Sequence, residues 1–157
     1  MRSKRHSAKR PSMELTRRRK FLIYTIVVST WSSGVLWLVL HYFLQRRGEF
    51  GVEPNPFEFW ILALHGACAF AALWLAGWIW TTHILPWWHG QRRRNSGIVL
   101  IAFTSALILS GYLLYYASGD SLREWIGVIH WCVGLAAAIP LFVHALRSWR
   151  YRATPLR

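Results

Sequence analysis

FEFWILALHGACAFAALWLAGWIWTTHIL, residues 57–85, is the stretch that decides the fold, because it holds a single charged residue, Glu58, in a run long enough to cross a membrane. One helical crossing of a bilayer core of about 30 Å needs about 20 predominantly apolar residues. Stretches at residues 21–44, 97–117 and 124–146 meet the same requirement. The sequence therefore predicts an all-α integral membrane protein whose four transmembrane helices form an up-down-up-down bundle.

The composition agrees with a chain that is surrounded mostly by lipid. Of its 157 residues, 54% are hydrophobic and only 16% are charged, which is too apolar for a soluble domain of this size. We expect one transmembrane domain at residues 21–148, flanked by basic tails at residues 1–20 and 149–157. The first apolar run is longer than a signal-peptide core and lacks an A-x-A cleavage site, so we expect it to be a retained anchor.

The net charge of +13 indicates an orientation in the membrane rather than a nucleic-acid partner. Most of the 19 Lys and Arg residues fall in segments 2–20, 92–94 and 147–157, which four crossings place on one side. The positive-inside rule assigns that side to the cytoplasm, so both termini are expected there. The remaining acidic residues beyond the amino-terminal tail fall on the opposite side: Glu49, Glu53, Glu58, Asp120 and Glu124. Basic tails beside a lipid surface account for the charge, and no nucleic-acid partner is expected.

Four histidines within the crossings are the candidate functional residues, because ionisable side chains inside a membrane are costly. His65 and His83 are 18 residues apart, which is five α-helical turns, so they are expected on one face of the second crossing. His130 and His144 are 14 residues apart, about four turns, on the fourth crossing. These two helices run in the same direction. We therefore expect an outer pair, His65 with His130, and an inner pair, His83 with His144.

The levels of the pairs follow from the expected helix starts. With starts at Pro56 and Ser121, His65 and His130 each lie nine residues into their helices and should be level. The unequal spacings leave the inner pair offset by roughly 6 Å along the axis. Helix tilt, or a kink at Pro140, is expected to absorb this offset. Small residues follow the outer histidines and leave room for a flat ligand: Ala69, Ala72, Gly134 and Ala137.

Two level pairs of imidazoles are the ligand set of two six-coordinate b-type haems, which transfer electrons. We expect an outer haem on His65 and His130 and an inner haem on His83 and His144. Arginines near each end are candidate partners for the haem propionates: Arg92, Arg93 and Arg94 inside, and Arg46, Arg47 or Arg123 outside. A zinc or copper site is disfavoured, because the histidines lack nearby carboxylates and clustered thiolates.

The other histidines and the cysteines have simpler interpretations. Cys68 and Cys132 are expected to be small core residues without a disulfide. His41 lies at the outer end of the first crossing, too shallow to match His65. A hydrogen bond between helices, competition for haem and a place in a quinone pocket all stay open for it. His89 is expected in a packing or interfacial position.

The segments LHGAC around His65, WTTH ending at His83, IHWCVG around His130 and FVHAL around His144 resemble the four-helix di-haem cytochromes b of bacterial membranes. This superfamily includes the cytochrome b subunits of formate dehydrogenase and nickel-iron hydrogenase. The resemblance covers residues 20–148, as a pattern of helices and histidines. It implies bis-histidine haem b, electron exchange with the quinone pool, a partner redox protein or catalytic subunit, and the bacterial inner membrane as location.

Two functions follow from these observations. The first is a b-type cytochrome that transfers electrons between quinone or quinol and a partner redox protein, as a subunit rather than a stand-alone enzyme. The second is a haem-free membrane anchor or assembly subunit whose histidines bond only between helices. The sequence offers no nucleophile–base pair, phosphate-binding glycine loop or mid-membrane carboxylate for other catalysis. Haem content per polypeptide distinguishes the two functions.

Overall fold

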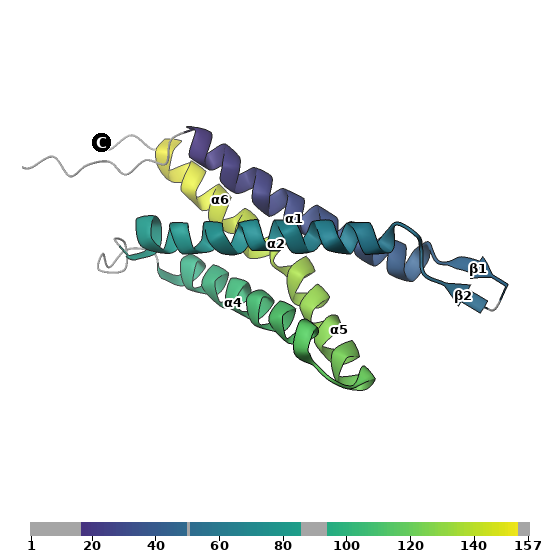
Figure 1. The fold of residues 1–157 in the computed structure, drawn as a ribbon. Helices are drawn as coiled ribbons and strands as arrows, with labels where there is room; N and C mark the ends of the chain where they lie inside the picture. The colour runs from purple at the N-terminus through teal and green to yellow at the C-terminus, as the bar shows by residue number, and fades with distance from the viewer. Residues whose placement is uncertain (1–16, 50, 86–93, 154–157) are drawn as a thin grey trace, which may run out of the picture.

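The computed structural model describes residues 17–49, 51–85 and 94–153, and these are mostly helical. The elements are, in order, α1 (Arg17–Phe43), β1 (Arg46–Gly48), β2 (Gly51–Glu53), α2 (Glu58–Ile79), the π-helical turn η1 (Trp80–Ile84), α4 (Arg94–Tyr116), α5 (Asp120–Ala136) and α6 (Ala138–Ala153). Two helical hairpins make up most of the chain, because α1 packs against α2 and α4 packs against α5 (Figure 1).

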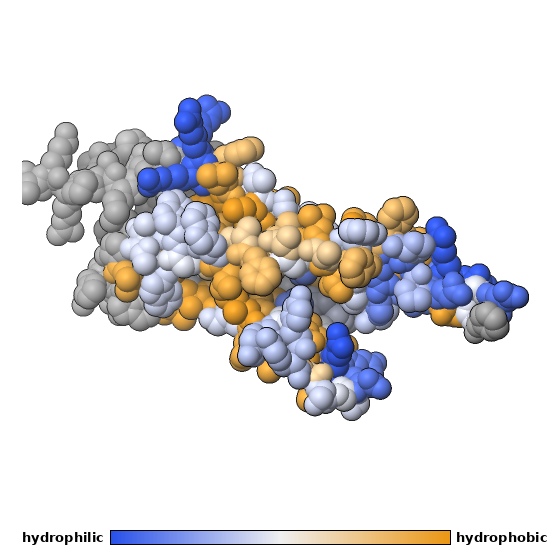
Figure 2. Space-filling view, in the orientation of Figure 1, coloured by the Kyte–Doolittle hydropathy of each residue, from blue (hydrophilic) through white to orange (hydrophobic). Residues whose placement is uncertain are grey.

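Four helices are long and apolar enough to cross a membrane, and this part of the sequence prediction is confirmed. They cover Arg17–Phe43, Glu58–Thr82, Asn95–Tyr116 and Asp120–Leu146. Apolar side chains cover the middle of the molecule, between hydrophilic side chains at the start of α1 and around the β1–β2 ribbon (Figure 2). Such a distribution suits a multi-pass membrane protein whose middle contacts lipid and whose two ends contact water.

Few side chains are buried between the helices. In the described part of the chain, the buried residues are Leu40, Leu75, Ser33 and Ser110, whereas large apolar side chains such as Phe70 point outward, 74% exposed. Lipid is as apolar as these side chains, so burial inside the protein gives little driving force for helix association. Close packing and polar contacts have to hold the helices together instead. Two of the four buried residues are serines that make such contacts.

A short antiparallel ribbon occupies the connection between α1 and α2, where the sequence gave no indication of strands. Arg46 lies opposite Glu53 in the register, a favourable cross-strand pairing of opposite charges. Gly51 turns the ribbon with a φ of 128°, which favours glycine. The end of the molecule that holds this ribbon and the α4–α5 turn is called the ribbon end below (Figure 1).

The helix starts differ from the expected ones by one or two residues. The Asn55 side chain accepts a hydrogen bond from the backbone N–H two residues later, at 3.0 Å, and α2 begins at Glu58 rather than Pro56. At the other hairpin α5 begins at Asp120 rather than Ser121, directly after a glycine with a φ of 110°. The outer histidines therefore do not lie at equal distances from their helix starts.

The second crossing widens into the π turn η1 at its C-terminal end. Thr81 and Thr82 donate their hydroxyl hydrogens to the carbonyl oxygen of Trp78, at 3.1 and 2.7 Å. These bonds compete for a carbonyl that the α-helical ladder uses, and they favour a wider turn. The expectation that His65 and His83 share a face assumed an unbroken α-helix, so the count of five turns does not apply.

The fourth crossing is interrupted at Ala137, between α5 and α6. Pro140 has no N–H to bond the carbonyl of Ala136, which is the last residue of α5. Beyond the interruption α6 runs at a different inclination from α5 (Figure 1). The break that the sequence predicts near Pro140 is therefore present, and it places His130 in α5 and His144 in α6.

Candidate functional site

His65 on α2 and His130 on α5 approach each other between the two hairpins. Their ring centroids are 6.3 Å apart, and the ring planes lie at 85° to each other. The backbones of α2 and α5 do not pack closely, so the two side chains bridge the space between these helices. The structure thus brings together the predicted outer pair.

Helix α1 holds the His65 ring from behind. The Nδ1 atom lies 3.0 Å from the carbonyl oxygen of Thr30 and 3.1 Å from the hydroxyl oxygen of Ser33. A carbonyl oxygen only accepts, so Nδ1 carries the proton and donates it. Ser33 itself donates to the Thr30 carbonyl at 3.0 Å. These contacts fix the tautomer in which Nε2 keeps its lone pair.

Helix α4 holds the His130 ring in the same way. The Nδ1 atom of His130 lies 2.8 Å from the hydroxyl oxygen of Ser110. That hydroxyl donates its hydrogen to the Ala106 carbonyl at 2.7 Å, so its oxygen accepts from Nδ1–H. His130 therefore also has Nε2 as the nitrogen with a free lone pair.

A glycine follows each of these serines and lets its helix approach the ring. A Cβ atom at Gly34 would lie 3.0 Å from Cε1 of His65, and a Cβ atom at Gly111 would lie 3.4 Å from Cε1 of His130. We call each Ser-Gly step, with the ring that it holds, a histidine seat. One hairpin carries the seat of Ser33, Gly34 and His65, and the other carries the equivalent seat with His130.

The outer pair fits the axial ligands of a planar metal macrocycle. With metal–nitrogen bonds of about 2.0–2.1 Å, the ring centres of two imidazoles on opposite sides of one metal ion lie roughly 6 to 6.5 Å apart. The observed separation of 6.3 Å agrees with this distance. Among the described residues, no three His, Cys, Asp or Glu side chains gather in a group that could hold a metal ion by themselves. The donor set therefore suits a haem, which supplies its own four equatorial nitrogens, better than a tetrahedral ion.

The inner pair is placed only in part. The Nδ1 atom of His144 on α6 lies 3.3 Å from the hydroxyl oxygen of Ser96 on α4, which again precedes a glycine. A Cβ atom at that Gly97 would meet nothing within 4 Å, so this third seat lacks the close glycine contact of the outer ones. His83 belongs to η1, but its side chain lies outside the described residues, so the ligand role of this pair stays a prediction.

Several other sequence expectations change. Cys68 is half-buried, but Cys132 is exposed, so the interpretation of Cys132 as a core residue is wrong. Ala69 is exposed, and Gly134 lies against Leu107 of α4, so these two do not line the space between the pair. Ala72 and Ala137 are half-buried.

The candidate propionate partners stay predictions. Arg46, Arg47 and Arg123 lie at the ribbon end, where Arg46 is opposite Glu53 in the ribbon. Arg92 and Arg93 lie outside the described residues, as do His89 and the side chain of Arg94. His41 contacts Glu58 rather than the outer pair, with 2.7 Å between Nδ1 and Oε1.

Sequence reasoning assigned Ser33, Gly34 and Gly111 to helix packing and overlooked their contact with the ligand candidates. The dipeptide Ser-Gly occurs three times in the crossings, at residues 33–34, 96–97 and 110–111. The last two are 14 residues apart, as are His130 and His144. In an antiparallel helix pair, equal spacings on both helices bring the same residue types together twice. This coincidence of spacings was the signal that the seats offered.

The chain matches no protein-family model, no curated protein and no solved structure. The resemblance to di-haem cytochromes b therefore stays a prediction from the pattern of histidines, and the argument for function depends on the geometry of the seats.

Proposed function

We propose that this chain is a membrane b-type cytochrome in which His65 and His130 ligate an outer haem b, and His83 and His144 an inner one. The observation that carries the proposal is the approach of two imidazoles at 6.3 Å, each bonded through Nδ1 to a neighbouring helix. In both rings this leaves Nε2 as the metal-binding nitrogen. Quinone or quinol and a partner redox protein would exchange electrons with the chain.

The chain's part in electron transfer is to hold both ligand rings still. Haem b, when bound, supplies one-electron exchange between ferric and ferrous iron. Thr30 accepts from His65, and Ser110 accepts from His130, which raises the basicity of each Nε2 and fixes the ring rotation. Rings fixed in this way need little rearrangement when an electron arrives or leaves. The apolar helices around them keep water from the site.

The proposal includes insertion of the chain as an up-down-up-down four-helix bundle in a bacterial inner membrane. The starts of α1 and α4 and the ends of η1 and α6 lie at the end of the molecule opposite the ribbon (Figure 1). Arg17, Arg18, Arg19 and Lys20 begin α1 there. The positive-inside rule places this basic end in the cytoplasm and the ribbon end outside.

Haem content per polypeptide tests the proposal. The purified protein should bind two haems b with low-spin bis-histidine spectra. His65→Ala and His130→Ala should each remove the outer haem and bring the content close to one. His89→Ala, which changes a histidine outside the four predicted ligands, is the matched control and should keep both haems. Wild-type protein without haem, or unchanged haem content in both ligand variants, would refute the proposal.

A haem-free membrane anchor is the second candidate, and one observation favours it. The two outer seats already join helices through hydrogen bonds between histidine and serine, and such bonds stabilise helix association in lipid without a metal. In that case haem content is near zero under every expression condition, and His65→Ala and His130→Ala lower only the thermal stability.

A further inference from the structure

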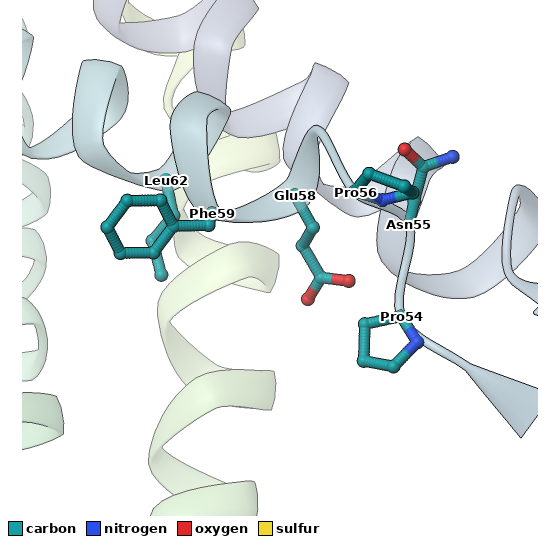
Figure 3. A pocket seen from close by; sticks show the side chains of 6 residues that line it. All are labelled: Pro54, Asn55, Pro56, Glu58, Phe59 and Leu62. Atoms are coloured by element: carbon teal, nitrogen blue, oxygen red, sulfur yellow. The ribbon is translucent and has the colours of Figure 1, made fainter.

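A hollow of about 390 Å³ lies at the ribbon end of α2, beside the first turn of that helix (Figure 3). Its walls are mostly proline, phenylalanine and leucine side chains, and one carboxylate extends between them. The lining residues are Pro54, Asn55, Pro56, Glu58, Phe59 and Leu62. Apolar walls with a small number of polar groups, in a volume above about 300 Å³, are typical of sites for small organic molecules.

The carboxylate of Glu58 is only half satisfied by the protein. Its Oε1 atom lies 2.7 Å from Nδ1 of His41, and the Glu58 side chain is 16% exposed. Its Oε2 atom is shielded from water and has no hydrogen-bond donor among the described residues. A buried acceptor without a donor is costly, so a hydroxyl group that donates to Oε2 would stabilise this site.

His41 connects the carboxylate to the aqueous surface. Its ring stacks on Trp37, with centroids 4.6 Å apart and planes at 14°, and this contact holds the ring in place. The His41 side chain is 39% exposed. Trp37 also carries a buried Nε1–H without an acceptor among the described residues. The cluster of Glu58, His41 and Trp37 thus offers both an unpaired acceptor and an unpaired donor near the end of a membrane crossing.

We infer that this hollow binds the headgroup of a quinol, whose hydroxyl donates to Glu58, and that Glu58 and His41 accept its protons. A quinol is an aromatic ring with hydroxyl groups that reaches a protein from the lipid, which suits apolar walls at the end of a span. The inference rests on the proposed cytochrome function for the electron acceptor, but the binding site stands on the hollow alone.

The position of the hollow suits electron transfer to the outer pair. Glu58 and His65 are seven residues apart on α2, which is about two turns, so they share a face and lie about 10 Å apart along the axis. Oxidation breaks two O–H bonds of the quinol and converts two C–O single bonds into carbonyls. The two electrons reduce two ferric haem irons, one each. The two protons leave through Glu58 and His41 to the water at the ribbon end.

Equilibrium dialysis of heptylhydroxyquinoline N-oxide, a fluorescent quinol analogue, tests the site in full-length protein in lipid nanodiscs, with empty nanodiscs as background. We expect one saturable site per chain. Glu58→Gln should weaken binding at least tenfold, because the amide is a poorer acceptor and cannot take the proton. Glu124→Gln removes an exposed carboxylate from the start of α5 and should bind like wild type.

Leu62→Trp is the second variant, because it fills the hollow without touching the pair of Glu58 and His41. Leu62 is 50% exposed, so the larger side chain extends toward lipid and leaves the fold intact. We expect it to abolish saturable binding, and this result decides the matter if Glu58→Gln fails to fold. Wild-type affinity in Leu62→Trp, or no saturable site in wild type, would overturn the inference and leave the pair as a structural contact.

The dialysis also separates this inference from the proposed function, because binding is measured whether or not haem is present. Saturable binding that depends on Glu58 in a protein without haem would keep the site and refute the cytochrome. Two haems in a protein without saturable binding would keep the cytochrome and refute the site. Haem reduction by a soluble quinol should slow in Glu58→Gln, whereas reduction by dithionite should not change.

Discussion

Replacement of Gly34 by alanine tests the outer histidine seat most directly. The added Cβ would lie 3.0 Å from Cε1 of His65, where ordinary van der Waals contact begins at 3.4 Å, so α1 and the ring must separate by about 0.4 Å. The ring cannot turn away freely, because Nδ1 is bonded to α1. Overpacking of this kind costs about 1–3 kcal/mol. Alanine is the better helix former by up to about 1 kcal/mol, so a net loss of up to about 2 kcal/mol is expected.

The assay is a matched glycine series in which only the space around the new methyl group differs. Gly111→Ala places its Cβ 3.4 Å from His130, and Gly77→Ala places its Cβ where nothing lies within 4 Å. Haem per polypeptide and the thermal midpoint are measured for each variant. We expect Gly77→Ala at or above wild type, Gly111→Ala close to wild type, and Gly34→Ala lowest in both. If Gly34→Ala behaves like Gly77→Ala, the close approach of α1 does not constrain the ligand and the reasoning is wrong.

Two further predictions concern the ligand contacts and the helix break. Ser110→Ala removes an acceptor from a buried Nδ1–H and should cost about 1 kcal/mol and raise the haem midpoint potential, because a ligand without that bond is less basic. Ser33→Ala should change both less, since the Thr30 carbonyl still accepts; redox titrations and melting curves compare them, and equal effects would contradict the assignment. Pro140→Ala restores the N–H for the carbonyl of Ala136 and should add up to about 3 kcal/mol while moving the inner ligand, so that haem content falls toward one. Circular dichroism and haem quantification check this, and an unchanged content would show that the break does not position the inner site.

The four apolar helices were predictable because the property that defines them is local. Length and apolar composition decide whether a segment can cross a bilayer, and neither depends on the partners of the helix. The ribbon was not predictable in this way, because its Arg, Gly and Glu residues have low strand propensity. Its pairing depends on the turn at Gly51 and on the ends of α1 and α2 lying side by side.

The meeting of His65 and His130 was expected for an incomplete reason. Counting from the assumed starts placed both nine residues into their helices, whereas His65 lies seven residues after Glu58 and His130 ten residues after Asp120. A difference of three residues is about 4.5 Å along a helix. The rings still meet because α5 is inclined to α2, as Figure 1 shows. Inclination depends on packing between the hairpins, which a count within one helix does not include.

The serines of the seats needed knowledge of which helices pair. Ser110 lies 20 residues from His130, and Ser33 lies 32 residues from His65, so neither contact belongs to a local motif. Once α1 is known to pack against α2, and α4 against α5, the Ser-Gly steps fall opposite the histidines. The π turn before His83 was equally hidden, because it depends on the two threonine hydroxyls that bond the Trp78 carbonyl.

The seats also account for how the hairpins recognise each other in lipid. Apolar side chains gain little when they leave lipid for protein, so the exposed phenylalanines and leucines do not favour one arrangement of the hairpins over another. The two buried serines each bond a histidine of their own hairpin and hold its ring toward the other hairpin. Within each hairpin the seat makes the helix pair specific, and between the hairpins the two imidazoles are the groups that meet. A metal bound between them would therefore join two halves that each already carry one oriented ligand, so the geometry that orients the ligands also determines how the halves assemble.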